Sequence, residues 1–236
     1  MAKLEYDGRD LEAMSFAERY HAWIVSLLRP YIGTAVAEVG AGSGSFTELL
    51  LKEQGVTELL AVEPSSEMYE RLVATTSHDA RVTTKNDFFS VVSNDYQNHF
   101  DTVVYVNVLE HVPDDVSELA HVYKALQPGG HVCIFVPALM WLFSEHDRTI
   151  GHYRRYHKQP LIALLQGAGF EVRTVRFFDI IGILPWFIVM KLMRTSPAAG
   201  SVGLYDRVVV PVARMLESII TPPIGKNLLI VGRKPL

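Results

Sequence analysis

The sequence predicts an α/β fold built on a doubly wound, mostly parallel seven-stranded sheet. Three observations predict it. Short apolar runs alternate with helical patterns along much of the chain. One such run, residues 35–39, breaks into glycines at 40, 42 and 44 immediately before a helical pattern. Another run, residues 100–107, is apolar almost throughout, which is typical of a strand covered on both faces.

Each remaining element follows from the same patterns. Apolar spacing predicts an N-terminal helix over 16–31 with Ser15 as its N-cap, while 126–131 reads as a turn and 194–203 as a polar link. Further strands are expected at 59–62, 81–85, 132–136, 170–177 and 228–232, and further helices at 116–126, 161–165 and 208–220.

Composition limits the function classes. The chain has 236 residues, enough for one domain with a substantial core, which we divide into a helical cap (1–32), a cofactor-binding core (33–137) and an acceptor-side region (138–236). A net charge of -4 gives no overall attraction to nucleic acid or anionic lipid. The single Cys133 excludes an internal disulfide, and the first residues carry no apolar signal core, so we expect a cytoplasmic protein.

The glycine loop at 40–44 predicts a cofactor cradle, because glycine permits positive φ and leaves no Cβ between backbone and ligand. A dinucleotide fingerprint would require its third glycine at position 45, where this chain has Ser45. Together with Glu38, the glycines form the pattern E-x-G-x-G-x-G. That pattern resembles the first motif of class I S-adenosylmethionine-dependent methyltransferases.

The resemblance implies a binding site for S-adenosylmethionine, which leaves as S-adenosylhomocysteine. Glu63 lies about twenty residues beyond the loop, at a strand end where a carboxylate can accept hydrogen bonds from both ribose hydroxyls. By resemblance, Asp87 accepts from the adenine amino group, and Phe88, or alternatively Phe89, packs on the ring. Asn107 turns the chain beside the methionine amino group. The expected cofactor-binding residues are Glu38, Gly40, Gly42, Gly44, Glu63, Asp87, Phe88 and Asn107.

Two further strings carry the resemblance: VLEHVPDD at 108–115 and LQPGGHVCIFVP at 126–137. Glu110 and His111 resemble the Glu-His pair of the ubiquinone-biosynthesis O-methyltransferases. Some of those enzymes carry an acid three residues earlier, where this chain has Asn107, so we assign no metal. His111 is either a general base or the partner of Glu110 in a structural pair.

The segment after the fifth strand, 137–156, predicts the acceptor site, because ligands of an open parallel sheet collect beyond the carboxyl ends of its strands. Its string DRTIGHYRRY resembles that of a bacterial subset of class I methyltransferases, some associated with polysaccharide or lipid biosynthesis. A hydroxyl or amine acceptor must lose a proton, so His146 and His152 are candidate bases. Candidate acceptor-binding residues are Asp147, which is alternatively an orienter of the base, Tyr153, Arg154, Arg155 and Tyr156; the arginines either clamp an anionic acceptor or pin the loop.

The predicted function is therefore methyl transfer to a small or lipid- or saccharide-linked acceptor, with O- or N-methylation favoured over C-methylation. An NAD-dependent oxidoreductase and a non-catalytic cofactor-binding or membrane-surface module are the alternatives. The apolar run within 180–193 is shorter than the ~20 residues of a membrane span and contains Pro185. It either packs as core or lid, contacts a membrane surface, or forms a homodimer.

Overall fold

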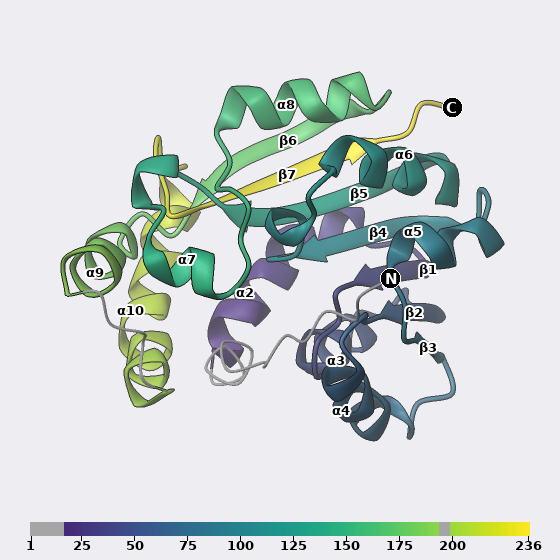
Figure 1. Ribbon diagram of the computed structural model, residues 1–236, viewed down its shortest axis with the longest axis horizontal. Coiled ribbons are helices and arrows are strands. Elements are labelled where there is room, and N and C mark those ends of the chain that lie inside the picture. The colour runs from purple at the N-terminus through teal and green to yellow at the C-terminus, as the bar shows by residue number, and fades with distance from the viewer. Residues whose placement is uncertain (1–16, 194–198) are drawn as a thin grey trace.

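A computed structural model describes residues 17–193 and 199–236, and a seven-stranded sheet organises them (Figure 1). The strand order is β3-β2-β1-β4-β5-β7-β6, with β1 to β5 paired in parallel and β7 antiparallel to both of its neighbours. The predicted doubly wound, mostly parallel seven-stranded sheet is confirmed. The strands are β1 (Ala35–Val39), β2 (Glu58–Val62), β3 (Val82–Lys85), β4 (Phe100–Val106), β5 (Leu126–Pro137), β6 (Glu171–Phe178) and β7 (Asn227–Arg233).

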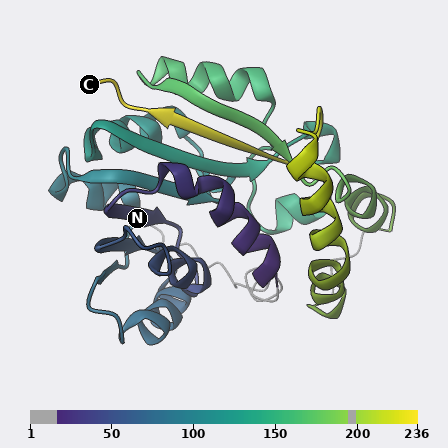
Figure 2. The same cartoon turned by 180° about the vertical axis from the view of Figure 1, so that it is seen from behind.

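Helices cover both faces of this sheet (Figures 1 and 2). The helices are α2 (Glu18–Leu28), α3 (Ser45–Leu51), α4 (Ser66–Thr76), α5 (Phe89–Val92), α6 (Asp115–Ala125), α7 (Glu145–Thr149), α8 (Lys158–Gly167), α9 (Ile183–Trp186) and α10 (Ala199–Ile219). Shorter helical turns are η1 (Arg29–Tyr31), η2 (Ser93–Asp95), η3 (Leu109–His111), η4 (Met140–Leu142) and η5 (Phe187–Leu192), of which η5 is a π-helix.

The sheet separates two apolar cores. Val103 belongs to the core under α5, α6 and α8, and its neighbour Val104 belongs to the core under α2, α3, α4 and α10. Both side chains are fully buried, because successive residues of a strand point to opposite faces and helices cover each face. The unbroken apolar run of β4 is explained by this double burial.

Two expected boundaries differ from the structure. The segment 126–131, expected as a turn, opens β5, because Leu126 pairs with Phe100 of β4 before a shift in register. The helix expected at 208–220 begins at Ala199, so 199–203 is helical and not a link, while 194–198 lie outside the described residues. Ser15, the expected N-cap of the first helix, also lies outside them.

Asp206 of α10 caps the N-terminus of α2. Its carboxylate accepts hydrogen bonds from the backbone N–H groups of Arg19 (3.1 Å) and Tyr20 (2.9 Å). These donors belong to the first turn of a helix, which has no partners of its own for them. The contact joins α2, near the start of the described chain, to α10. It also fixes which side of α10 faces inward.

The connection from β6 to β7, which contains α9, η5 and α10, lies at the edge of the sheet where the site is expected. It leaves the carboxyl end of β6 and enters the antiparallel β7, so it lies beside the loops that leave β4 and β5. Within residues 17–193 and 199–236, no helix has both the length and the apolarity to span a bilayer.

Candidate functional site

The glycine loop leaves β1 with three residues in the left-handed region. Gly40, Gly42 and Gly44 have φ values of +70°, +57° and +89°. The backbone N–H of Gly40 donates to the carbonyl of Val62 (2.8 Å), which ties the loop to the end of β2. A Cβ on Gly40 would lie 2.4 Å from a methyl carbon of Val108, so this position requires glycine twice over, for conformation and for space.

Acids, an aromatic ring and an amide follow the neighbouring strands at the same edge. Glu63, only 7% exposed, accepts hydrogen bonds from the N–H groups of Gly42 (2.9 Å) and Ser65 (2.8 Å), which leaves each carboxylate oxygen one further lone pair. Phe88 is 37% exposed whereas Phe89 is 2% exposed in the core, and Asp87 accepts from the N–H of Phe88. A bare loop, a carboxylate and an exposed ring fit the sulfonium, ribose and adenine parts of S-adenosylmethionine.

Glu38 and Asn107 lie in different surroundings. Glu38 is 4% exposed within β1 and accepts a hydrogen bond from the Thr47 hydroxyl (2.6 Å). Burial raises the pKa of Glu38 to about 8, so its carboxyl is mostly protonated at neutral pH. Its hydrogen-bond partner, Thr47, belongs to α3. Asn107 ends β4 with φ +54°, a conformation that asparagine tolerates better than most residues.

A buried chain of polar groups occupies the acceptor side. His152 Nδ1 lies 3.0 Å from Asp147 Oδ1, and the same oxygen accepts from Arg155 Nε (2.8 Å). The other oxygen, Oδ2, accepts from the N–H and hydroxyl of Ser144 (2.8 Å each). Burial alone would raise the pKa of Asp147, but these hydrogen bonds and the Arg155 charge lower it to about 2. Asp147 is therefore ionised and fully buried, and it lies in contact with the His152 ring.

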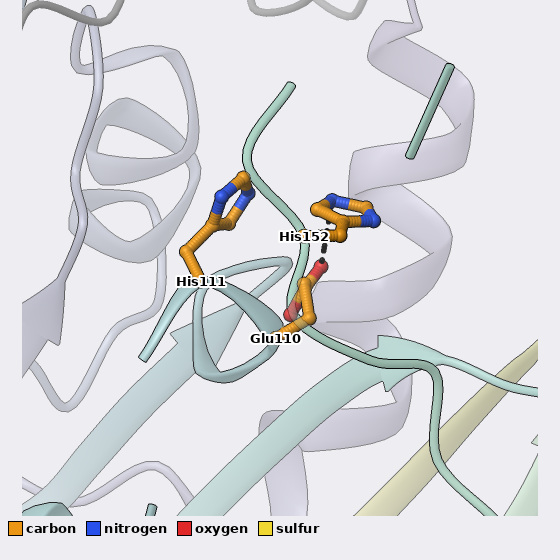
Figure 3. A group of neighbouring side chains, drawn as sticks. All are labelled: Glu110, His111 and His152. Atoms are coloured by element: carbon orange, nitrogen blue, oxygen red, sulfur yellow. Dashed lines mark ion pairs between the residues drawn. The ribbon is translucent and has the colours of Figure 1, made fainter. Parts of the chain in front are cut away.

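Glu110 and His111 of η3 lie against the same imidazole (Figure 3). Glu110 Oε1 is 3.8 Å from His152 Nε2, and the His111 and His152 rings lie with centroids 4.5 Å apart. The Glu110 side chain is fully buried, and neither of its oxygens has a hydrogen-bond partner. Burial raises the pKa of Glu110 to about 7, and burial together with the His152 charge lowers that of His111 to about 4.

These three side chains offer ligand atoms within 4.8 Å of one another, so Glu110, His111 and His152 are also the described group that could hold a metal ion. The Nδ1 of His152 would then keep its hydrogen bond to Asp147, as metal-bound histidines commonly do. The sequence had suggested no metal because of Asn107. His152 supplies a ligand from a distant part of the chain, which spacing alone did not reveal.

Both arginines of the loop make contacts within the protein. Arg155 is 4% exposed and lies over the Trp186 ring at 4.7 Å while bonding Asp147. Arg154 donates to Asp115 Oδ2 (2.6 Å) and to the carbonyl of Pro113 (2.7 Å). Both guanidinium groups use donors internally, which favours the pin over the clamp.

The two aromatic candidates of the loop differ in exposure. Tyr156 is 6% exposed, and its hydroxyl lies within hydrogen-bond distance of two acceptors, Asp115 Oδ2 (2.9 Å) and the carbonyl oxygen of Leu109 (3.2 Å). Tyr153 is 59% exposed, and its backbone N–H donates to the carbonyl of Glu110 (2.9 Å). Of the five loop residues expected to bind acceptor, Tyr153 is therefore the one that presents its side chain to solvent.

His146 lies apart from the His152 cluster, on α7 with its ring 5.9 Å from that of Trp186. Sequence reasoning overlooked Ser144, which caps α7 and donates to Asp147. The pattern Ser144-x-x-Asp147 is a capping box, and that signal could have identified it. It also overlooked Trp186, whose role depends on packing across the β6–β7 connection.

The sequence relatives of this chain are methyltransferases. A family model described as a methyltransferase domain matches residues 24–175. The ubiquinone biosynthesis O-methyltransferase of Paramagnetospirillum magneticum is 32% identical over 108 residues, 44% of this chain and 41% of that protein. The enzyme of that name from Vibrio vulnificus strain YJ016 is 28% identical over 135 residues, 56% of this chain and 52% of that protein. The chain thus spans about half the length of the curated relatives it matches.

Solved structures share the fold at lower identity. A SAM-dependent methyltransferase from Archaeoglobus fulgidus has a TM-score of 0.61 and 17% identity, covering 95% of this chain and 99% of that chain. A Haemonchus contortus phosphoethanolamine N-methyltransferase, in complex with S-adenosylhomocysteine, has a TM-score of 0.67 and 17% identity, covering 100% of this chain and 61% of that chain. The match of the family model over residues 24–175 shows that the chain belongs to the methyltransferase domain family, and the solved structures show the same fold.

Proposed function

We propose that the protein methylates a hydroxyl oxygen of a lipid- or saccharide-linked acceptor and that His152 is the general base. The observation that carries this proposal is the buried chain from Arg155 through Asp147 to His152. A hydroxyl is a weak nucleophile until its proton is removed, and a positioned imidazole contributes about 10²- to 10⁴-fold to such a transfer. The names of the curated relatives, all O-methyltransferases, agree with oxygen as the acceptor atom.

In this proposal, Asp147, Arg155 and Ser144 position His152 to remove the acceptor's proton. When bound, S-adenosylmethionine supplies a methyl group that its sulfonium has already activated. Asp147, ionised, accepts a hydrogen bond from Nδ1 of His152 and so leaves the Nε2 lone pair to take the acceptor's proton. Asp147 then stabilises the imidazolium, because the carboxylate lies 3.0 Å from the ring. Arg155 and Ser144 hold that carboxylate in place.

The cofactor part of the proposal assigns Glu63 to the ribose, Asp87 and Phe88 to adenine, and Asn107 to the methionine end, with Gly40, Gly42 and Gly44 as the bare loop. Its support is that these residues share the carboxyl edge of neighbouring strands. We further propose that the protein belongs to the bacterial subset with the LEH motif and the GHYRRY loop and that it is cytoplasmic. Residues 180–193 then contact either a membrane surface or a second copy of the chain.

A methyl-transfer assay tests the base. Labelled S-adenosylmethionine is incubated with an organic-solvent extract of cells, and the methylated atom is identified by mass spectrometry. We expect His152→Ala to lower incorporation by about 10²-fold or more, with Asp147→Asn lowering it as well, because the base is lost or misoriented. Calorimetry should show unchanged cofactor binding in both variants.

His157→Ala is the matched control, an exposed histidine five residues along the same segment, and it should retain wild-type incorporation. His146→Ala separates the two histidines that the sequence singled out. If His146→Ala abolished transfer while His152→Ala did not, the assignment of the base would be wrong. An N- or C-methylated product would contradict the assignment of the acceptor atom.

Removal of divalent metal is a separate prediction. Because Asp147 already orients His152, we expect methyl transfer to survive dialysis against EDTA. The measurement is incorporation before and after dialysis, with metal content determined on both samples. Loss of activity that Mg²⁺, Mn²⁺ or Zn²⁺ restores would instead assign Glu110, His111 and His152 to a metal ion.

A further inference from the structure

One end of the molecule exposes a large apolar surface on α9, η5 and α10. We define this α9–α10 face by six side chains that are each 55–77% exposed: Leu184, Leu192, Leu204, Val208, Met215 and Ile219. Figures 1 and 2 show α9 and α10 together at this end, beyond the strands. Exposed apolar residues scattered singly need no explanation, but Leu204, Val208, Met215 and Ile219 gather on a single helix, and a set gathered in this way marks an interaction site.

Contacts with the protein body fix the inward side of α10, and the opposite side therefore faces solvent. Asp206 caps α2, and Glu217 accepts from the N–H of Ile180 (3.0 Å) while its own carbonyl accepts from Arg176 (2.6 Å). Residues 204, 208, 212, 215 and 219 lie at steps of three and four residues, on one side of the helix and away from these anchors. The face is therefore held rigidly outward.

The charge on this face has one sign. Within 180–193 and 199–224 the only acids are Asp206 and Glu217, and both are buried at 6% and 3% exposure. The basic residues Lys191, Arg207 and Arg214 are all exposed. Arg214 also borders an open groove of about 390 Å³ together with Arg19 of α2, above a floor of Val210 and Pro211. The whole chain carries -4, so this positive region is local.

We propose that the α9–α10 face docks the protein on an anionic lipid surface. Apolar side chains flanked by Arg and Lys are the pattern of a helix lying in the membrane interface, where apolar residues enter the acyl boundary and cations meet lipid phosphates. A second copy is the poorer occupant, because the exposed charges of η5 and α10 are all basic and would meet the same cations of the other copy. The side of α9 that meets the acceptor segment is that of Trp186, which contacts Arg155 and His146, whereas Leu184 is 64% exposed.

The surface deepens the proposed function, since it rests on a lipid-linked acceptor for its use. The β6–β7 connection carries the face and also contacts the loop that holds His152, through Trp141 and Phe187 with ring centroids 6.0 Å apart. Docking there would place the acceptor side next to the bilayer. Vesicle binding is nevertheless measurable without any acceptor, so its failure and a failure of methyl transfer are distinguishable.

Vesicle flotation of the full chain tests the proposal. We expect the protein to float with vesicles of phosphatidylglycerol and phosphatidylcholine in equal parts, to stay behind with phosphatidylcholine alone, and to dissociate at high salt. Two double variants, Arg207→Gln with Arg214→Gln and Leu204→Gln with Ile219→Gln, should each lower the bound fraction roughly tenfold or more. Circular dichroism checks that each variant is folded. Because one double variant removes charge and the other removes apolar contact, each tests a separate part of the proposal.

The matched controls are Val116→Gln, 62% exposed, and Lys124→Gln, both on the solvent side of α6, and neither should change binding. The proposal is overturned if the wild type does not bind anionic vesicles, or if the bound fraction is equal for both vesicle compositions. It is also overturned if light scattering shows a dimer that Leu204→Gln with Ile219→Gln dissociates, because the face would then be a homodimer interface.

Discussion

At the scale of single residues, burial decides what the acceptor loop can do. Arg155 and Asp147 have side chains that are 1% and 0% exposed, with Nη2 and Oδ1 2.7 Å apart. A buried pair of this kind contributes little net stability when complete, but removing one partner leaves an uncompensated charge. Burial and the shared contact with Asp147 therefore favour a role for Arg155 in holding the loop over a role in binding an anionic acceptor.

The pin and the clamp give opposite results for Arg155→Met. If the residue is a pin, the free energy of unfolding falls by about 3–5 kcal/mol, because Asp147 loses its buried partner. Urea denaturation measures this change. Arg148→Met is the control, since Arg148 is 64% exposed and its pair with Glu145 is worth at most about 1 kcal/mol. A normal unfolding curve with a raised KM for the acceptor would instead show that Arg155 is a clamp.

At the scale of elements, the loop between β1 and α3 depends on backbone freedom. Gly40→Ala would place a Cβ 2.4 Å from Val108 and would hold an alanine at φ +70°. We expect lower thermal stability and at least tenfold weaker binding of S-adenosylmethionine, because the loop must shift to relieve both conflicts. Calorimetric titration gives the affinity.

Gly167→Ala is the control for that experiment. Gly167 ends α8, and a Cβ there would meet nothing within 4 Å. Its cofactor affinity should equal that of the wild type. If Gly40→Ala bound the cofactor as tightly as Gly167→Ala, the loop would not form the cradle that we assign to it.

At the scale of the whole molecule, buried acids set how stability depends on pH. Glu38 lies in the middle of the sheet, where burial raises its pKa from 4.5 to about 8. The folded protein therefore binds this proton more tightly than the unfolded chain does. Its contribution to stability is fully present below about pH 4.5 and is lost progressively as the pH rises to about 8.

Glu38→Gln removes this titration while keeping an oxygen to accept from Thr47. We expect the unfolding free energy of the wild type to fall relative to that of the variant between about pH 4.5 and about 8, and the difference to level off above that. Urea denaturation at several pH values measures both curves. Parallel curves across this range would contradict a raised pKa for Glu38.

Local patterns predicted much of the fold. The alternation of apolar runs and helical spacing located β1 to β4 within one or two residues. For β1, β2 and β4 the reason is that a strand buried on both faces is apolar along most of its length, whereas β3 is a polar edge strand. Patterns did poorly at α10, whose first turns contain Gly200 and Gly203. Helix propensity is low there, and tertiary contact through Asp206 stabilises the helix instead.

From the sequence by itself, the glycine spacing at 40–44 and the strand-end acid Glu63 indicated a cofactor cradle, because these are local features, and the resemblance of the E-x-G-x-G-x-G pattern to a known family indicated the methyltransferase class. Only the tertiary structure decided how the acceptor side is arranged. It brought His152 to Glu110 and His111 from some forty residues away, buried Asp147 and Arg155 against each other, and turned the apolar residues of α10 outward. Burial and partners depend on which distant segments pack together, and one-dimensional spacing carries no record of that packing.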